Sequence, residues 1–304
     1  NVKVYASTDP DAIPEDVPVA MADISDLKMT IITNDPAKRY YYTLLFGDKY
    51  RVKIATRNVN IPGIQNFRDL GGYPSYSTKK QVRWGMIYRS AEIDSLECYS
   101  RRELRNLGIK TLIDLRASSE TGRQSPLQKE FNVVHIPLAT GDMENILKGI
   151  REEKIKSDTV YRMVEQMNRD LIDKYTTEYR QIFDILLDKN SYPVVIHCSS
   201  GKGRTGIVSA LVLAALGINE DIIMEDYRLS NDYFNIPSAS KDAYQLPARS
   251  QEAITTLFSA REDFLNAAKE EAERRYGDID SYLQKGIGLN KDEIKRLRSI
   301  LLSD

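Results

Sequence analysis

One cysteine and one arginine, Cys198 and Arg204, are separated by five residues in the glycine-rich stretch HCSSGKGRTG. A short β-branched run of Val194, Val195 and Ile196 comes before it, and an apolar segment predicted to be helical begins near Arg204. A loop between a strand and a helix N-terminus offers backbone N–H groups and partial positive charge to an anion. The spacing therefore predicts a loop that holds a tetrahedral oxyanion beside a sulfur nucleophile.

The side chains of this loop fit transfer of a phosphoryl group to sulfur. Arg204 can hold two phosphate oxygens in bidentate fashion, which a lysine cannot do with the same geometry. Positive surroundings favour the thiolate of Cys198, which would attack phosphorus in line and form a phosphocysteine intermediate. Thr205 is placed to hydrogen-bond the sulfur when the thiolate is regenerated, and His197 is expected to orient the loop. The predicted substrate-binding positions are Ser199, Ser200, Gly201, Lys202, Gly203 and Arg204.

Other interpretations of the loop fit the sequence less well. Residues 201–206, GKGRTG, satisfy the dinucleotide pattern G-x-G-x-x-G, but Glu220 and Asp221 begin a predicted helix where an acidic strand end is required. A Walker A loop fails because Gly203, not Ser or Thr, follows Lys202. An inert buried thiol is the ordinary role of a cysteine, but it leaves the other loop residues unexplained.

Composition excludes several classes of protein. The 304 residues are 41% hydrophobic and 29% charged, with a net charge of −1, so no global basic field attracts nucleic acid. No apolar run approaches the ~20 residues of a membrane-spanning helix. Two cysteines make no disulfide framework, and the presence of just two histidines, His135 and His197, argues against a metal site. We expect no metal and no cofactor.

The chain is predicted to divide near residue 57. Residues 1–57 are rich in β-formers, with expected strands at VKVY, MTIIT (residues 29–33) and a hairpin formed by YYYTLLF and YRVKIAT. They are interpreted as a small β module, with an extension pairing onto the main sheet as the alternative. Residues 58–304 alternate predicted strands and helices, which indicates an α/β layer with a central, mostly parallel sheet flanked by helices. Within it, residues 159–187 and 250–276 are expected to be helical, and residues 231–247 to form a polar loop.

The loop resembles the signature of the protein tyrosine phosphatase superfamily, H-C-x-x-G-x-x-R-[ST]-G. Further segments resemble the bacterial tyrosine-protein phosphatase family, which includes secreted mycobacterial and listerial phosphatases: NFRDLGGY, WGMIYRSAE, LGIKTLIDLRASSE, YRLSNDYF and YGDIDSYLQKGIGLNKDEIKRLR. The resemblance covers about residues 58 to 302. It implies a cysteine-phosphatase fold and hydrolysis of phosphate monoesters through a phosphocysteine.

One loop position departs from the family pattern. Members often read H-C-x-x-G-K-D-R-T-G, whereas Gly203 stands in this chain where they carry the aspartate. The leaving group therefore needs a proton from another residue. Two aspartates are candidates. Asp142 follows the predicted strand NVVHIPL (residues 132–138), and Asp114 lies near the end of the predicted strand IKTLIDLR (residues 109–116). A salt bridge to Arg116 is the alternative role of Asp114. Asp69 of FRDLGGY is expected to hold loop structure.

The resemblance implies a phosphotyrosine phosphatase and leaves its specificity open. Dual specificity toward phosphoserine and phosphothreonine stays open. A phosphoinositide phosphatase is the first alternative, because GKGRTG (residues 201–206) is similar to the loop of a phosphoinositide 3-phosphatase. A pseudophosphatase that binds phosphate without turnover is the second. Arsenate reduction is disfavoured because Cys98 is the only other cysteine. Similarity to secreted relatives favours an exported protein, in which transient pairing of Cys98 with Cys198 stays open.

Overall fold

The computed structural model describes residues 1–94, 96–121 and 126–303. Its centre is a five-stranded sheet of order β10-β9-β11-β8-β5. The first four strands in this order are parallel, and the edge strand β5 runs antiparallel to β8. The strands are β5 Arg68–Asp69, β8 Ile87–Ser90, β9 Thr111–Asp114, β10 Asn132–His135 and β11 Val194–His197. This confirms the α/β class with a mostly parallel central sheet.

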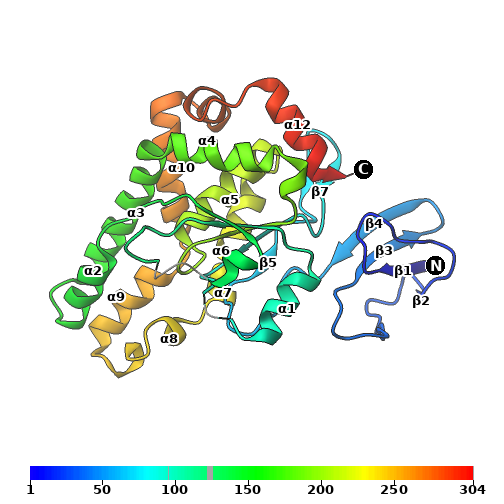
Figure 1. The fold of residues 1–304 in the computed structure, drawn as a ribbon, viewed down its shortest axis with the longest axis horizontal. Coiled ribbons are helices and arrows are strands. Elements are labelled where there is room, and N and C mark those ends of the chain that lie inside the picture. Colours follow the sequence, from blue (N-terminus) through cyan, green and yellow to red (C-terminus); the bar gives the residue numbers. More distant parts are fainter. Residues whose placement is uncertain (95, 122–125, 304) are drawn as a thin grey trace.

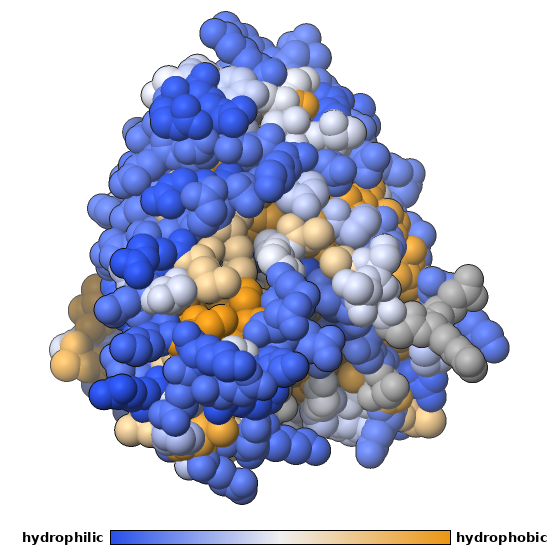
Figure 2. Space-filling model, turned by 90° about the vertical axis from the view of Figure 1, so that its left-hand side faces the viewer, coloured by the Kyte–Doolittle hydropathy of each residue, from blue (hydrophilic) through white to orange (hydrophobic). Residues whose placement is uncertain are grey.

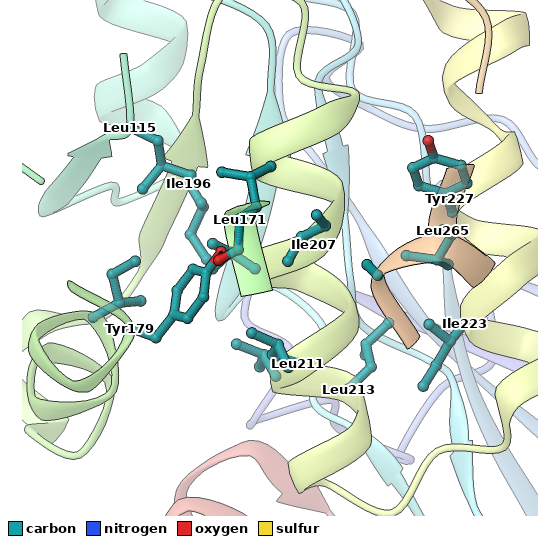
Figure 3. Packing of buried hydrophobic residues seen from close by; sticks show 14 of the residues in the cluster. Leu115, Leu171, Tyr179, Ile196, Ile207, Leu211, Leu213, Ile223, Tyr227 and Leu265 are labelled. Atoms are coloured by element: carbon teal, nitrogen blue, oxygen red, sulfur yellow. Dashed lines mark hydrogen bonds between the residues drawn. The ribbon is translucent and has the colours of Figure 1, made fainter. Parts of the chain in front are cut away.

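The central strand β11 is buried along its whole length. Val194, Val195 and Ile196 are fully buried, as expected for a parallel strand with both faces covered. The following helix α5, Gly203–Ala215, is apolar around its circumference and is also buried. Figure 3 shows Ile207 and Leu211 of α5 within the core cluster that also contains Ile196 of β11. The strand and the helix that flank the loop are thus fixed by the core.

Helices surround the sheet (Figure 1). They are α1 Cys98–Asn106, α2 Met143–Arg151, α3 Ser157–Lys174, α4 Thr176–Leu186, α6 Glu220–Arg228, α7 Ser230–Tyr233, α8 Ile236–Ala239, α9 Ala248–Phe258, α10 Glu262–Tyr276, α11 Ile279–Ser281 and α12 Lys291–Leu301. Short 3-10 turns lie at Pro126–Lys129, Lys189–Ser191 and Ala243–Gln245, and Tyr282–Gly286 forms a π-helical turn. No helix in the described ranges is long and apolar enough to cross a membrane.

Two further sheets flank this core. Near the N-terminus, β1 Val2–Ser7, β2 Ala20–Ala22, β3 Tyr41–Phe46 and β4 Tyr50–Ala55 form an antiparallel sheet of order β2-β1-β3-β4. It lies to one side of the helical body (Figure 1), so the expected β-rich start and its hairpin are confirmed. A small sheet joins β6 Pro74–Ser75, β7 Lys80–Val82 and the C-terminal β12 Leu302–Ser303. The division into two domains near residue 57 stays a prediction.

Several expected elements are wrong in extent. Residues 29–33 form no strand, and Ile32 is 89% exposed. The segment stays irregular because β-forming residues need a neighbouring strand to pair with. Residues 250–276 form two helices, α9 and α10, because Asn231 takes the Ala260 N–H at 2.7 Å and fixes the chain between them. The segment 159–187 breaks at Tyr175, and 231–247 contains short helices in place of a loop.

Candidate active site

The register of the parallel strands gathers the site at one edge of the sheet. His197, the last residue of β11, lies level with Asp114 on β9 and with Ser90 on β8. The chain then leaves the sheet at Cys198 and enters α5 at Gly203. Ligand sites of parallel α/β sheets lie at these carboxyl ends, so the predicted loop has the expected place.

The loop requires glycine at position 201. Gly201 has a φ of +69°, and a Cβ atom there would lie 2.5 Å from the Ser90 carbonyl oxygen. Its carbonyl oxygen accepts a hydrogen bond from Arg89 Nη2 at 2.7 Å. Asn66 Nδ2 donates to the carbonyl oxygens of Ser200 and Gly201, each at 3.1 Å. Buried side chains therefore hold the outer carbonyls of the loop.

Cys198 and Arg204 line the same small cavity, of about 70 Å³. Cys198 is buried, and the loop residues Ser200, Lys202 and Gly203 also contribute to its walls. The remaining walls come from neighbouring segments and are largely apolar: Thr140, Met143, Val164, Met167, Asn168, Leu171, Leu257 and Phe258. The structure thus brings the predicted nucleophile and the predicted anion-binding arginine together at one small cavity.

The guanidinium of Arg204 is held by Glu120, a residue that sequence reasoning missed. Arg204 Nη1 and Nη2 donate to the two carboxylate oxygens of Glu120, the second at 2.8 Å. Nη1 also donates to the Leu138 carbonyl at 3.2 Å, and Nη2 to Ser199 Oγ at 2.8 Å. Because each Nη carries two hydrogens, all four are engaged. Glu120 therefore occupies the fork that the sequence assigns to phosphate.

Lys202 is buried at the wall of the cavity. Its Nζ donates to the Leu257 carbonyl at the end of α9 and lies 5.7 Å from the centre of the Phe264 ring. Burial lowers the pKa of Lys202 to about 7. Contact of this side chain with a second phosphate group of a substrate stays a prediction.

Asp114 forms the salt bridge that was its alternative role. Arg116 donates to the Asp114 carboxylate from Nη2 at 2.9 Å and from Nε at 3.1 Å, and its backbone N–H donates at 3.0 Å. Burial alone would raise the pKa of Asp114, but the bonds from Arg116 outweigh it and the pKa is lowered. His197 Nδ1 lies 4.0 Å from this carboxylate, and burial lowers the pKa of His197 to about 4. His197 is therefore neutral at physiological pH.

Asp142 lies on the segment that borders the cavity. It caps α2 by accepting the Asn145 N–H at 3.0 Å, and its neighbours Thr140 and Met143 line the cavity. The Tyr175 hydroxyl fixes the position of this segment. It accepts a hydrogen bond from the Ala139 N–H at 3.1 Å and donates one to the Ala139 carbonyl at 2.9 Å.

Glu92 is a second acidic residue beside the loop that sequence reasoning missed. Its N–H donates to the Ser199 carbonyl at 3.1 Å. Burial, together with repulsion from Asp94, raises the pKa of Glu92. The available signal for both missed residues was their place in the family-like segments WGMIYRSAE, which ends at Glu92, and LGIKTLIDLRASSE, which ends at Glu120.

The remaining predicted residues take simple positions. The Thr205 hydroxyl is buried and finds no hydrogen-bond partner within residues 1–94, 96–121 and 126–303, so its bond to sulfur stays a prediction. Cys98 is exposed on α1, Cys198 is buried, and both are free thiols. Asp69 accepts the N–H groups of Gly71 and Gly85, each at 2.7 Å, which fits its expected structural role.

Comparison with known proteins finds relatives of this chain. The chain is 30% identical over 285 residues to the triple specificity protein phosphatase PtpB of Mycobacterium tuberculosis, covering 80% of this chain and 98% of PtpB. It is 25% identical to a putative tyrosine-protein phosphatase of Cupriavidus necator, covering 76% and 85% of the two chains. Among solved structures, the catalytic core of the PP-IP phosphatase SIW14 from S. cerevisiae matches with a TM-score of 0.31 and 17% identity, covering 60% of this chain and 87% of that one.

A family model described as the tyrosine phosphatase family matches residues 59–303, which is nearly the whole chain beyond the N-terminal sheet. The matched segment contains the Cys198 loop, Arg204 and the five-stranded sheet that positions them. The chain belongs to the tyrosine phosphatase family.

Proposed function

We propose that the protein hydrolyses phosphotyrosine through a phosphocysteine formed at Cys198. The Cys198 thiolate attacks phosphorus, the phenoxide of tyrosine leaves with a proton from the enzyme, and water then releases phosphate from the sulfur. Loop N–H groups and Arg204 hold the equatorial oxygens, where the transition state spreads its charge. Arg204 is free for this role when Glu120 gives up its place on the guanidinium.

The apolar walls of the cavity are the observation that favours an aromatic phosphate. Met143, Val164, Met167, Leu171 and Phe258 surround the space beside Cys198, and among the described residues Thr140 and Asn168 are the polar ones that line it from outside the loop. A phenyl ring gains from such a lining, whereas an inositol ring would lose hydrogen bonds to water there. Helices α2, α3 and α9 lie on one side of the molecule (Figure 1), and Figure 2 shows hydrophobic residues exposed in the middle of that side.

We also propose Asp142 as the proton donor to the leaving group. Support comes from its position between Thr140 and Met143 at the cavity, on the segment whose Leu138 carbonyl touches Arg204. Asp114 is less suited, because the fork of Arg116 stabilises its ionised form. Glu92, with its raised pKa, is the alternative donor if Asp142 fails.

The proposed function is tested by a substrate panel with wild type and Cys198→Ser. We expect wild type to hydrolyse aryl phosphates and phosphotyrosine peptides faster than phosphoserine peptides or soluble phosphoinositides, and Cys198→Ser to bind phosphate without turnover. A wild type that binds phosphate but never turns over would establish the pseudophosphatase alternative. Preference for phosphoinositides would contradict the argument from the apolar walls.

The proton donor is tested by comparing leaving groups. Asp142→Asn should slow hydrolysis of an alkyl phosphate by about 10²-fold or more, and that of a nitrophenyl phosphate much less, because a good leaving group needs little protonation. Glu144→Gln, on the first turn of the same helix, is the matched control and should change neither rate. Equal losses on both substrates reject Asp142, and the same comparison with Asp114→Asn and Glu92→Gln then identifies the donor.

A further inference from the structure

An arginine from the N-terminal region, in the segment between two strands of its sheet, is buried against the body of the protein. Arg39, between β2 and β3, has a side chain only 11% exposed and pairs with the fully buried Asp69 at 2.7 Å. The same Nη1 lies 2.8 Å from the Tyr88 hydroxyl and 3.0 Å from the Tyr41 hydroxyl, and Nη2 donates to the Thr56 carbonyl at 2.8 Å. This is a specific, buried contact between residues outside the family match and residues inside it.

Its two partners in the main body are opposite each other on neighbouring strands. Asp69 of β5 pairs with Tyr88 of β8, and the next pair in the register is Arg68 with Arg89. Successive side chains of a strand point to opposite faces. One face of the β5–β8 pair therefore receives Arg39, and the opposite face carries two fully buried arginines.

Those two arginines hold the phosphate-binding loop. Arg89 donates to the Gly201 carbonyl from Nη2 at 2.7 Å and to the Asp226 carboxylate from Nη1 at 2.8 Å. Arg68 donates to the Asp226 carbonyl at 2.7 Å and to Asn66 Oδ1. Asn66 in turn donates to the Gly201 carbonyl at 3.1 Å. Both routes from the strand pair end on the same loop carbonyl.

We propose that Arg39 is a positioning residue for the phosphate-binding loop, acting through the β5–β8 strand pair. The inference rests on the proposed function in one respect, namely that this loop binds the phosphate. The N-terminal sheet is then a working part of the enzyme and not an independent appendage.

The physical link is the charge of Asp69. Its carboxylate also accepts the N–H groups of Gly71 and Gly85, so the segments on both sides of the small sheet are arranged around it. Without Arg39 the buried carboxylate loses its cation, and a buried charge without a partner becomes more stable if it moves toward water. Such a movement shifts β5 against β8 and carries Arg68 with it. Displacements of about 1 Å at supporting residues can lower rates by about 10²-fold.

The test compares Arg39→Met and Arg39→Lys with a matched control, Arg51→Met, in the full chain carrying Cys98→Ser. Arg51 lies on β4 of the same sheet and pairs at the surface with Glu15 at 2.8 Å. Two properties are measured: kcat and KM on an aryl phosphate, and the protection by inorganic phosphate of Cys198 against alkylation by iodoacetate. Melting temperatures fix an assay temperature at which every variant is folded.

We expect Arg39→Met to lower kcat at least about tenfold and to weaken phosphate protection by a similar factor. Arg39→Lys should recover part of both, because it keeps the charge beside Asp69 and loses the fork. Arg51→Met should stay within about twofold of the parent. A purely structural role would lower the melting temperature of Arg39→Met and leave kcat and protection of the folded protein unchanged, which would overturn the proposal.

Two further outcomes are decided by the same design. If Arg39→Met does not fold, Arg39→Lys and Tyr88→Phe, which removes one of the hydroxyl contacts of Arg39, replace it; parent values in both would refute the role of Arg39. If the parent shows no turnover, the proposed function fails. The alkylation measurement then still decides whether Arg39 controls phosphate binding at the loop.

Discussion

Replacing Glu120 with glutamine tests whether Glu120 competes with phosphate for Arg204. The carboxylate engages both terminal nitrogens of Arg204 and also accepts the Ser199 hydroxyl at 2.7 Å. A phosphate that binds both of these nitrogens through two oxygens must displace the carboxylate. Glutamine has nearly the same shape but no charge, so Glu120→Gln weakens the competitor and leaves the loop sequence intact.

The size of the effect follows from the ionisation of Glu120. Burial alone would raise its pKa, but the hydrogen bond and charge of Arg204 outweigh this and lower the pKa from 4.5 to about 2. At ~1.4 kcal/mol for each pKa unit, the gross coupling is about 3 kcal/mol. The Glu120 side chain is 30% exposed, and solvent screening reduces the coupling to about 1–2 kcal/mol. Phosphate should therefore bind Glu120→Gln about 5- to 30-fold more tightly than wild type.

The assay is the dissociation constant of inorganic phosphate, measured by calorimetry on Cys198→Ser with and without Glu120→Gln. Glu130→Gln is the matched control, because Glu130 pairs with Arg105 at 2.8 Å outside the loop and should leave phosphate binding unchanged. Weaker binding in Glu120→Gln would refute the reasoning. It would mean that Glu120 holds Arg204 in its binding orientation and moves aside with no competition.

The remaining predictions concern the loop and its strand. Gly201→Ala should cost about 1–3 kcal/mol of unfolding free energy and abolish tight phosphate binding, because the new Cβ meets the backbone of Ser90 at a positive φ. Gly203→Ala is the control and should cost little, because a Cβ there meets nothing within 4 Å. Equal losses of stability for the two variants in denaturant titrations would contradict the geometry. His197 has a folded pKa of about 4 against 6.5 in the unfolded chain, so its contribution to stability is complete above pH 6.5 and is lost as the pH falls toward 4. His197→Asn should therefore show a flatter decline of unfolding free energy between pH 7 and 5, by about 1–3 kcal/mol, and an unchanged pH profile would refute a buried, neutral His197.

Local patterns were sufficient to predict the central elements of the fold. Val194 to Ile196 form a continuous apolar run, and the helix after Arg204 is apolar on every side, because both are buried by tertiary packing. The break between α9 and α10 has no comparable signal. It depends on a hydrogen bond from the Ala260 N–H to Asn231, a residue 29 positions away, and local helical periodicity carries no information about such a contact.

Some residues of the candidate site can likewise be predicted from the local sequence, and others depend on contacts between distant segments. Cys198 and Arg204 are predicted by spacing alone, because one loop must present both. Glu120 and Arg39 act across 84 and 30 positions of sequence, and their partners become visible only when the strands are placed beside each other. Asp114 illustrates the intermediate case: its position at a strand end is readable, and its pairing with Arg116 was a stated alternative, but the three bonds that fix its ionised form require the folded geometry.

The most direct test of the central claim is to trap the covalent intermediate. Wild-type protein mixed rapidly with an aryl phosphate and quenched in acid should carry one phosphoryl group, and peptide mass spectrometry should place it on Cys198. Cys198→Ser should carry none on this peptide under the same conditions. A phosphoryl group on another residue, or steady turnover in Cys198→Ser, would contradict the account of Cys198 as the nucleophile.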